Sequence, residues 1–159
     1  MNLMEISNQG ISLIKQSEGC KLTAYKDSVG VPTIGYGHTK GVRMGMVITQ
    51  ALAEQYLKDD LQPIKKLLNG MGVNFKQSQF DALCSWIFNL GASKFNSSTL
   101  KKYIVANKSD VEIGDQIIRW VYASDKPLLG LKRRRIAEAN MFVGRDIYYL
   151  DNNNDIKRK

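Results

Sequence analysis

The chain has 159 residues, 43% of them hydrophobic, and its Lys and Arg residues exceed Asp and Glu by 23 − 15 = +8. A chain of this length buries about 68–70% of its unfolded surface, enough for one domain without disulfides or a metal. A single histidine and two cysteines far apart in the sequence exclude a multi-histidine site and give no zinc cluster, so neither a metal nor a cofactor is expected.

The excess of positive charge favours a polyanionic partner, such as nucleic acid, anionic lipid or an anionic cell-wall polymer, without choosing among them. Residues 1–6 lack the basic and apolar regions of a signal peptide. No stretch approaches about 18 apolar residues, so no transmembrane helix is expected. We therefore expect synthesis and folding in a cytoplasm, with free thiols. Cys20 is expected to be a small buried side chain, and its pairing with Cys84 is left open.

The first elements are a helix and a hairpin. Apolar residues between Ser7 and Glu18 have helical spacing, Ser7 is a suitable N-cap, and Gly19 suits the position after the helix. Residues 22–39 are rich in Gly, Thr, Tyr and Val, which predicts an antiparallel β-hairpin. Within it, residues 27–30 begin with Asp and end with Gly, as a type I turn prefers.

The rest of the chain has mostly helical patterns. A helix from Thr49 to Asn69 is expected to kink at Pro63 or to restart there, and Gly70 to Gly72 end it. Four more helices are predicted, in this order: a core helix with apolar positions from Phe80 to Phe88, closed by Gly91; one capped by Ser97 or Ser98 and reaching about Asn107; one opened by the capping box Ser109–Glu112; and one from Leu131 to Val143. The polar tail after Gly144 is expected to be frayed.

These elements predict an α+β fold. We expect one domain over residues 1–159, with a small N-terminal lobe and connecting helix over about 1–60. A mainly helical lobe with a polar tail follows over 61–159. The long helix from Thr49 would link the lobes, and a cleft between lobes is where a substrate binds.

Two carboxylates and a hydroxyl lie close together in the sequence where the first helix meets the hairpin. Glu18 ends the helix, where the negative end of the dipole favours a neutral carboxyl, and partial burial acts in the same direction; both suit a general acid. Asp27 in its turn can stay charged, and Thr33 can hold a water molecule. Each has an ordinary alternative, as a surface glutamate, a turn residue and a strand residue. Glycoside hydrolysis requires an acid, a carboxylate and a held water, so the combination favours that chemistry.

The arrangement Glu-Gly…Ala-Tyr-x-Asp…Gly-x-x-Thr-Ile-Gly-Tyr-Gly-His-Thr around these residues resembles the active-site signature of the phage-type lysozymes (endolysins), a family of glycoside hydrolases. Further segments resemble that family's later helices, so that the resemblance covers about residues 5–143: Gln79–Leu83, Phe88–Gly91, Ser98–Leu100 and Gly130–Glu138.

The resemblance implies hydrolysis of the β-1,4 bond between N-acetylmuramic acid and N-acetylglucosamine in peptidoglycan. Glu18 would be the proton donor, and Asp27 with Thr33 would position or activate the attacking water, by an inverting route. The enzyme would be a monomer. It would leave the host cytoplasm through a separate membrane-pore protein (a holin) and act on the wall in the periplasm.

The resemblance also implies supporting residues. Arg134 or Arg135 would form an ion pair with Glu18, which favours its charged form and opposes the dipole; a solvated basic helix face is the alternative. Three groove-lining candidates would bind sugar, although core or cap positions would also explain them: Phe88, Asn89 and Thr99. Four residues near the site would have structural roles: Gly30, Gly35, Gly37 and His38.

Two other classes of function remain open. The first is a non-catalytic cationic protein that binds the cell wall or membrane. The second is a basic nucleic-acid-binding protein, which the run of basic residues at 132–135 and the net charge could suit. No helix-turn-helix, zinc or RNA-binding motif accompanies that run, so no specific nucleic-acid partner is expected.

Overall fold

The computed structural model describes residues 3–123 and 126–159. Met1 and Asn2, where the segment tested for a signal peptide begins, lie outside these ranges. Within them the chain forms seven helices: α1 (Asn8–Glu18), α2 (Gln50–Asn69), α3 (Gln77–Leu90), α4 (Ala92–Asn96), α5 (Thr99–Val105), α6 (Asp110–Ile117) and α7 (Leu129–Val143). The strands of the same ranges form three antiparallel pairs: β1 (Lys21–Lys26) with β2 (Pro32–Gly35), β3 (Tyr122–Ala123) with β4 (Lys126–Pro127), and β5 (Tyr148–Leu150) with β6 (Ile156–Arg158).

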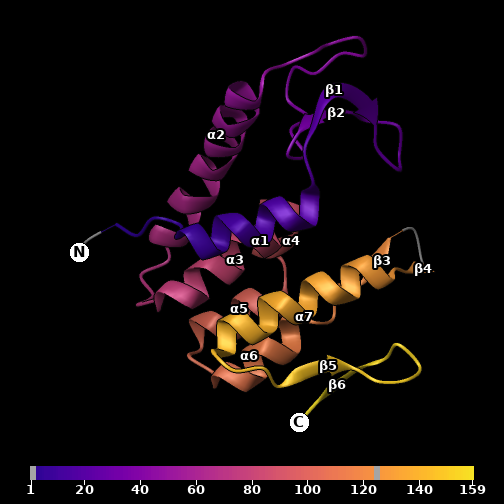
Figure 1. Cartoon of the computed structure of the whole chain (residues 1–159). Coiled ribbons are helices and arrows are strands. Elements are labelled where there is room, and N and C mark those ends of the chain that lie inside the picture. The colour runs from indigo at the N-terminus through magenta and orange to yellow at the C-terminus, as the bar shows by residue number, and fades with distance from the viewer. Residues whose placement is uncertain (1–2, 124–125) are drawn as a thin grey trace.

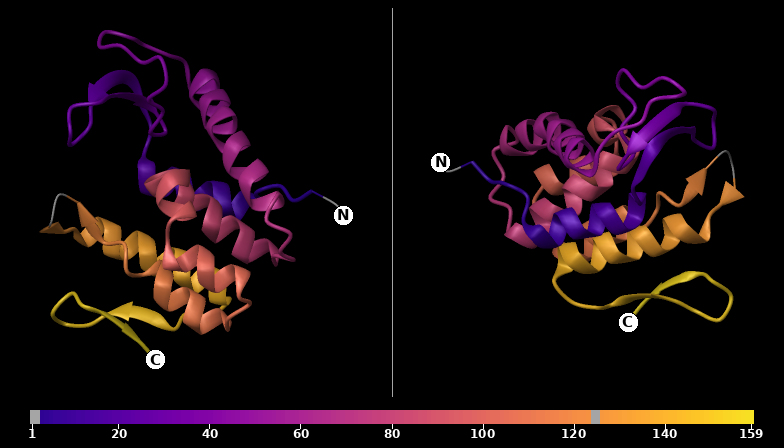
Figure 2. Two further views of the ribbon diagram at one scale, coloured as in Figure 1. Left: turned by 180° about the vertical axis from the view of Figure 1, so that it is seen from behind. Right: turned by 45° about the horizontal axis from the view of Figure 1, so that its top comes forward.

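The elements divide into a small sheet-bearing lobe and a helical lobe, as the sequence predicted. In Figure 1 the β1–β2 hairpin and the first turns of α2 lie at one end, and α3 to α7 gather at the other. Helix α1 leads into the hairpin, and α2 returns the chain from the hairpin side to the helical lobe (Figure 2). This is a mixed α+β architecture.

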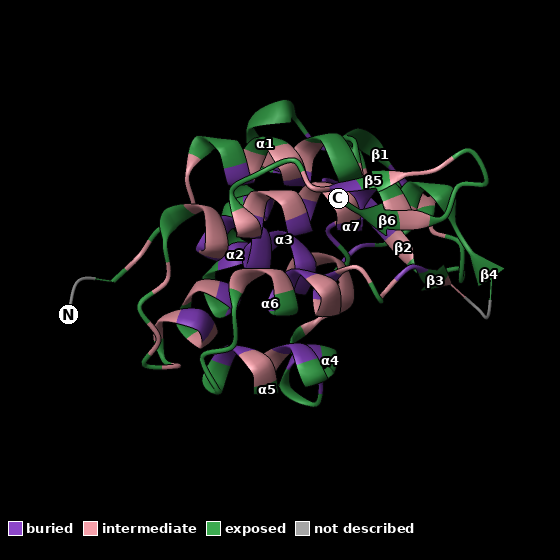
Figure 3. Ribbon diagram, turned by 90° about the horizontal axis from the view of Figure 1, so that it is seen from below, coloured by how far each residue is buried: buried purple, intermediate pink, exposed green. Residues whose placement is uncertain are grey.

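Helix α3 is the centre of the helical lobe. Its residues Phe80 to Ile87 are all buried, and it packs against α1, α2 and α7. A helix that is buried on every side must be apolar all round, which explains why its sequence carries so few charges. Figure 3 shows buried segments concentrated on α3 and on the faces of its neighbours that meet it. This packing therefore fixes the position of α3 relative to α1, α2 and α7.

The capping signals in the sequence placed several helix ends correctly. Ser7 accepts from the Gly10 N–H at the start of α1, and Gly19 follows its end with φ of 67°. Ser109 and Glu112 form the predicted capping box of α6. Of the two candidates for the cap of α5, Ser98 is the one that accepts a helix N–H, from Lys101.

Pro63 does not begin a second helix, because α2 runs unbroken from Gln50 to Asn69. Pro63 lies on the exposed face of the helix, between the buried residues Leu61 and Ile64. Proline has no N–H, so one backbone carbonyl of the preceding turn loses its helical hydrogen bond. On the exposed face that carbonyl can bind water, so the lost hydrogen bond costs less than it would in the core.

The prediction of a frayed tail is wrong. Residues after Gly144 form the β5–β6 hairpin, and Tyr148 is only 3% exposed. Its hydroxyl donates to Asp115 Oδ1 at 2.7 Å and contacts the Val111 carbonyl at 3.1 Å, both on α6. The polar run 151–155 is the connection of the hairpin, in which Asp151 Oδ1 accepts from the N–H groups of Asn153 and Asp155.

Candidate active site

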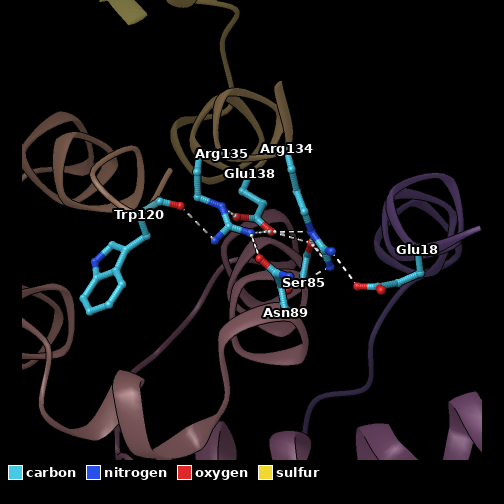
Figure 4. Close-up of polar contacts among 7 residues, drawn as sticks. All are labelled: Glu18, Ser85, Asn89, Trp120, Arg134, Arg135 and Glu138. Atoms are coloured by element: carbon cyan, nitrogen blue, oxygen red, sulfur yellow. Dashed lines mark hydrogen bonds and ion pairs between the residues drawn. The ribbon is translucent and has the colours of Figure 1, made fainter. Parts of the chain in front are cut away.

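Glu18 is the last residue of α1, and its carboxylate points across to α7. Arg134 Nη1 donates to Glu18 Oε2 at 2.5 Å. The Glu18 side chain is 19% exposed and the Arg134 side chain 6%, so the pair is largely shielded from water. Figure 4 shows the Arg134 guanidinium reaching from α7 toward Glu18. The structure thus answers which of the neighbouring arginines contacts Glu18.

The other carboxylate oxygen of Glu18 lies against the backbone of Gly37, in the segment after β2. A Cβ atom at position 37 would lie 2.7 Å from Glu18 Oε1, and Gly37 has φ of +73°. Both the contact and the left-handed backbone require a residue without a side chain. The Glu18 carboxylate is therefore held between the small lobe and α7.

The ion pair that the resemblance implied for Glu18 is present, and Arg134 is its basic partner. It lies at the end of α1, where the negative end of the helix dipole also faces the Glu18 carboxyl.

Asp27 has the turn role that its sequence position suggested. Its Oδ1 accepts from the N–H groups of Val29 at 3.0 Å and Val31 at 2.8 Å, and the Gly30 N–H donates to its carbonyl at 3.0 Å. Because both bonds use Oδ1, the turn fixes the carboxylate, and no partner for Oδ2 occurs within residues 3–123 and 126–159.

Thr33 lies on β2, opposite Tyr25 of β1, and is 4% exposed. Its hydroxyl donates to the Val31 carbonyl at 2.8 Å. The hydroxyl proton is thereby occupied, and the oxygen remains free to accept. A water molecule beside Thr33 would therefore donate a hydrogen bond to the hydroxyl oxygen, and the lone pairs of the water would point away from Thr33.

The negative charges of both candidate carboxylates act on Tyr25 of β1. Burial raises the pKa of the Tyr25 hydroxyl, and the negative charges of Glu18 and Asp27 raise it further. Both carboxylates therefore act on the same side chain, which lies on β1 between them in sequence. Tyr25 was not predicted as a site residue, although its position in the Ala-Tyr-x-Asp segment marked it.

The remaining residues of the hairpin region support the backbone. His38 is 7% exposed, stacks on Tyr56 with ring centroids 4.1 Å apart, and contacts Asp60 Oδ2 through Nδ1 at 2.8 Å. Gly30 has φ of +85° in its turn, and Gly35 has φ of +63° close to Ala53. These placements are structural.

A cleft of about 730 Å³ opens beside Glu18, between the second half of α1 and the first half of α7. Its polar and charged lining includes Gln16, Glu18, Asn89, Arg133 and Arg134. Its apolar lining comes from four leucines and an alanine: Leu13, Leu128, Leu129, Leu131 and Ala137.

Of the three predicted groove residues, only Asn89 lines this cleft. Phe88 is half-buried against the hydrophobic core on α3. Thr99 is exposed at the first position of α5 and lines a separate hollow of about 310 Å³ with Gln116, Arg119 and Trp120. The structure does not bring Phe88 or Thr99 to the cleft beside Glu18.

Arg135 turns away from Glu18 and is fully buried. Its Nη2 donates to Asn89 Oδ1 at 2.7 Å, and Nη1 reaches the Trp120 carbonyl at 3.5 Å. Its Nε lies 2.8 Å from Glu138 Oε1 as an ion pair, without hydrogen-bond geometry. Arg135 is therefore part of the support of the site and makes no direct contact with Glu18.

Glu138 is a second residue of the candidate site that was not predicted from the sequence. It is fully buried and accepts through Oε2 from Ser85 Oγ at 2.5 Å and from Arg134 Nε and Arg135 Nη2 at 3.3 Å (Figure 4). Burial raises the pKa of its carboxyl, and the two guanidinium groups act against that shift. Its spacing of three and four residues from the two arginines on one helix was the signal that could have revealed it.

The prediction that Cys20 is buried is wrong, while Cys84 is buried on α3. The two thiols are free, so they do not pair with each other. Cys20 lies two residues after the end of α1 and therefore outside the packed helix. Its Sγ lies 3.7 Å from Gln50 Oε1. Burial raises the pKa of Cys84 far above its ordinary range, which makes that thiol inert.

Among residues 3–123 and 126–159, no group of three or more His, Cys, Asp and Glu side chains is arranged to hold a metal ion. In the same part of the chain, every helix is too short or too polar to cross a membrane.

Comparison with known proteins agrees with this geometry. The family model described as phage lysozyme matches residues 15–138. An endolysin of Acyrthosiphon pisum secondary endosymbiont phage 1 is 41% identical over 145 residues, covering 87% of this chain and 98% of the relative.

Two solved structures share the fold over most of both chains. The endolysin from Escherichia coli O157:H7 phage FAHEc1 is 37% identical with a TM-score of 0.79, over 89% of this chain and 95% of that one. The muramidase domain of SpmX from Asticaccaulis excentricus is 33% identical with a TM-score of 0.81, over 87% and 97%. The chain therefore belongs to the phage lysozyme family, and it is a lysozyme-type glycoside hydrolase.

Proposed function

We propose that this enzyme is an endolysin that cleaves the β-1,4 bond between N-acetylmuramic acid and N-acetylglucosamine in bacterial peptidoglycan. The observation that carries the proposal is the Glu18 carboxylate, held by Arg134 and Gly37 at the edge of a cleft large enough for sugar rings. The muramidase domain among the structural neighbours supports this choice of bond.

Glu18 is the proton donor to the leaving sugar oxygen. A glycan that covers the cleft excludes water from the carboxyl. Arg134 stabilises the carboxylate that remains after the proton has left.

Asp27 and Thr33 position the attacking water. The Asp27 carboxylate is fixed by the two turn N–H groups, and the Thr33 oxygen can accept from the water. A water between sugar and carboxylate requires carboxyl groups about 6.5–9.5 Å apart and inverts the anomeric centre; direct attack requires about 5–5.5 Å and retains it. We infer inversion, and anomer-resolved NMR of early products would show it; retention would overturn this part of the mechanism.

Turbidity of outer-membrane-permeabilised Gram-negative cells tests the catalytic assignment. Glu18→Gln should lower the clearing rate by at least about 10²-fold, because a general acid contributes about 10²–10⁴-fold. Glu5→Gln is the matched control: it makes the same change in charge at a side chain that is 73% exposed and away from the cleft. Wild-type clearing by Glu18→Gln would refute the assignment.

The second candidate is a non-catalytic cationic protein that binds the anionic wall, which the net charge of +8 favours. Both variants raise the net charge equally, so they bind an anionic wall alike and differ only if Glu18 performs chemistry. Clearing by both variants would support the binding function.

The route to the wall is also a proposal. We infer a monomer in which residues 1–159 act as one unit. It would accumulate in the host cytoplasm and reach the periplasmic face of the wall through a holin lesion. Lysis in cells that express this chain with and without a holin tests the route: lysis without any pore-forming partner would contradict it.

A further inference from the structure

We propose that Glu138 is a positioning residue of this active site, which fixes Arg134 against Glu18 and, through Arg135, the carboxamide of Asn89. The inference rests on the proposed role of Glu18 as the acid. It adds a residue that makes no contact with the cleft and acts only through its neighbours.

The contacts of Glu138 hold Arg134 in one orientation. Arg134 Nε donates to Glu138 Oε2 at 3.3 Å, and its Nη2 donates to the Ser85 carbonyl at 3.2 Å. These bonds leave Nη1 directed at Glu18. A long arginine side chain has many rotamers, so anchoring its inner nitrogens decides where the outer one points.

Ser85 completes the anchor of Arg134. Arg134 Nε and Nη2 both donate to the hydroxyl oxygen of Ser85, Oγ, at 3.4 Å. The hydroxyl proton of Ser85 is therefore directed to Glu138 Oε2. Three donors therefore converge on one carboxylate oxygen, which an ionised group accepts best.

The second arm of the cluster sets Asn89. Arg135 is held by Glu138 and donates to Asn89 Oδ1 at 2.7 Å. Because the amide oxygen is occupied, Asn89 presents its N–H₂ donor to the cleft that it lines. A glycan acceptor, such as a hydroxyl or an acetamido carbonyl, matches that donor.

Glu138 also balances charge around the acid. Two guanidinium groups lie in the cluster, and Glu18 and Glu138 are the carboxylates paired with them. Of the other elements packed on α7, α6 and β5 contribute Asp115 and Tyr148, which bond to each other. Without the charge of Glu138, the two guanidinium groups would face Glu18 as the one carboxylate left in the cluster.

Two substitutions separate the effect of the charge of Glu138 from the effect of its side-chain length. Glu138→Gln keeps the shape and removes the charge, so the alkaline limb of kcat/KM should move by about one pH unit to lower pH. Glu138→Asp keeps the charge and loses one methylene, so the limb should stay in place while kcat falls. Solubilised peptidoglycan strands serve as substrate, below the unfolding temperature of each variant.

Asp81→Asn is the control for a merely structural effect. Asp81 is 1% exposed and is bonded to Ser7, at the end of α1 opposite Glu18. It should destabilise the fold and leave the pH profile of activity unchanged. If Glu138→Gln does not fold, Ser85→Ala takes its place, because it removes the anchor of Arg134 without stranding a charge; it should lower kcat at unchanged KM.

The outcomes are distinct. A wild-type pH profile and kcat in a folded Glu138→Gln, or a wild-type kcat in Ser85→Ala, would overturn the role of Glu138. Full activity of Glu18→Gln would instead overturn the proposed function. A shifted limb in Glu138→Gln with unshifted limbs in Glu138→Asp and Asp81→Asn supports the inference.

Discussion

At the scale of single residues, the site depends on how the two oxygens of Glu18 are held. One faces Arg134 from the helical lobe, and the other faces the backbone of Gly37 from the small lobe. Each contact restricts the carboxylate from a different direction, so a change on either side should displace the carboxylate of the proposed acid.

Gly37→Ala tests the contact on the small-lobe side. A left-handed backbone costs a non-glycine residue about 1–2 kcal/mol, and the new Cβ would also meet Glu18 Oε1 at 2.7 Å. We expect lower stability together with a loss of activity of about 10²-fold, because displacing a reacting group by about 1 Å can cost that much. Thermal unfolding and initial clearing rates measure the two effects.

Gly41→Ala is the matched control, with φ of +71° and no atom within 4 Å of its Cβ position. It should lose comparable stability and keep its activity. Equal activity in the two variants would contradict the importance of the Gly37 contact.

The sequence predicted the positions of Glu18, Asp27 and Thr33 in their elements because caps and turns are local signals. It could not choose between Arg134 and Arg135, which are adjacent and differ only in which side of α7 they face. That choice depends on how α7 packs against α1 and α3. The same packing places Phe88 against the core, half-buried, and Thr99 at a different hollow.

At the scale of elements, α1 joins the two lobes, and a polar network attaches its last turns to α2. Lys15 Nζ lies 2.8 Å from Glu54 Oε2, and Glu54 Oε1 also accepts from Gln50 and Tyr36. The network crosses from α1 to α2 and to the segment after β2. It therefore stabilises the position from which Glu18 reaches the cleft.

Glu54→Gln should show a pH-dependent loss of stability. The hydrogen bond from Lys15 lowers the pKa of Glu54 below its ordinary value of 4.5, so its contribution is present above 4.5 and lost as the pH falls through the lower folded value. The pair is partly exposed, so the loss at neutral pH should be about 0.2–1 kcal/mol. Urea unfolding at neutral pH and well below pH 4.5 measures it.

A double-mutant cycle with Lys15→Gln isolates the pair. The coupling between positions 15 and 54 should vanish in acid. A coupling that persists unchanged below the titration range would contradict the ion-pair account.

The C-terminal hairpin shows where local sequence signals mislead. Its polar connection predicted fraying, but Tyr148 packs on α6 and is nearly inaccessible. A strand with one buried residue in three carries almost no periodic signal, and the burial depends on helices far away in the sequence.

Tyr148→Ala should lower the free energy of unfolding by about 3–5 kcal/mol, as expected when a buried aromatic side chain is removed. Tyr149→Ala, at a neighbouring side chain that is 42% exposed, should change it by no more than about 0.5 kcal/mol. Denaturant titration of both variants compares them directly. Equal, small losses would mean that the hairpin adds no stability.

At the scale of the whole molecule, the proposed function combines a net positive charge with the cleft between α1 and α7. The net charge of +8 would attract the enzyme to an anionic wall, and the cleft would bind a glycan strand beside Glu18. Charge alone predicted several classes of polyanion. The buried cluster behind Arg134 distinguishes an enzyme from a simple binder, because surface attraction does not require buried, paired charges.

The most direct test of this account is to count and identify the new reducing ends released from purified peptidoglycan. Borohydride reduction followed by sugar analysis should give reduced N-acetylmuramic acid with the wild-type enzyme and almost none with Glu18→Gln. Reduced N-acetylglucosamine would contradict the proposed bond. Solubilised wall without new reducing ends, or equal release by Glu18→Gln, would contradict glycoside hydrolysis with Glu18 as its acid.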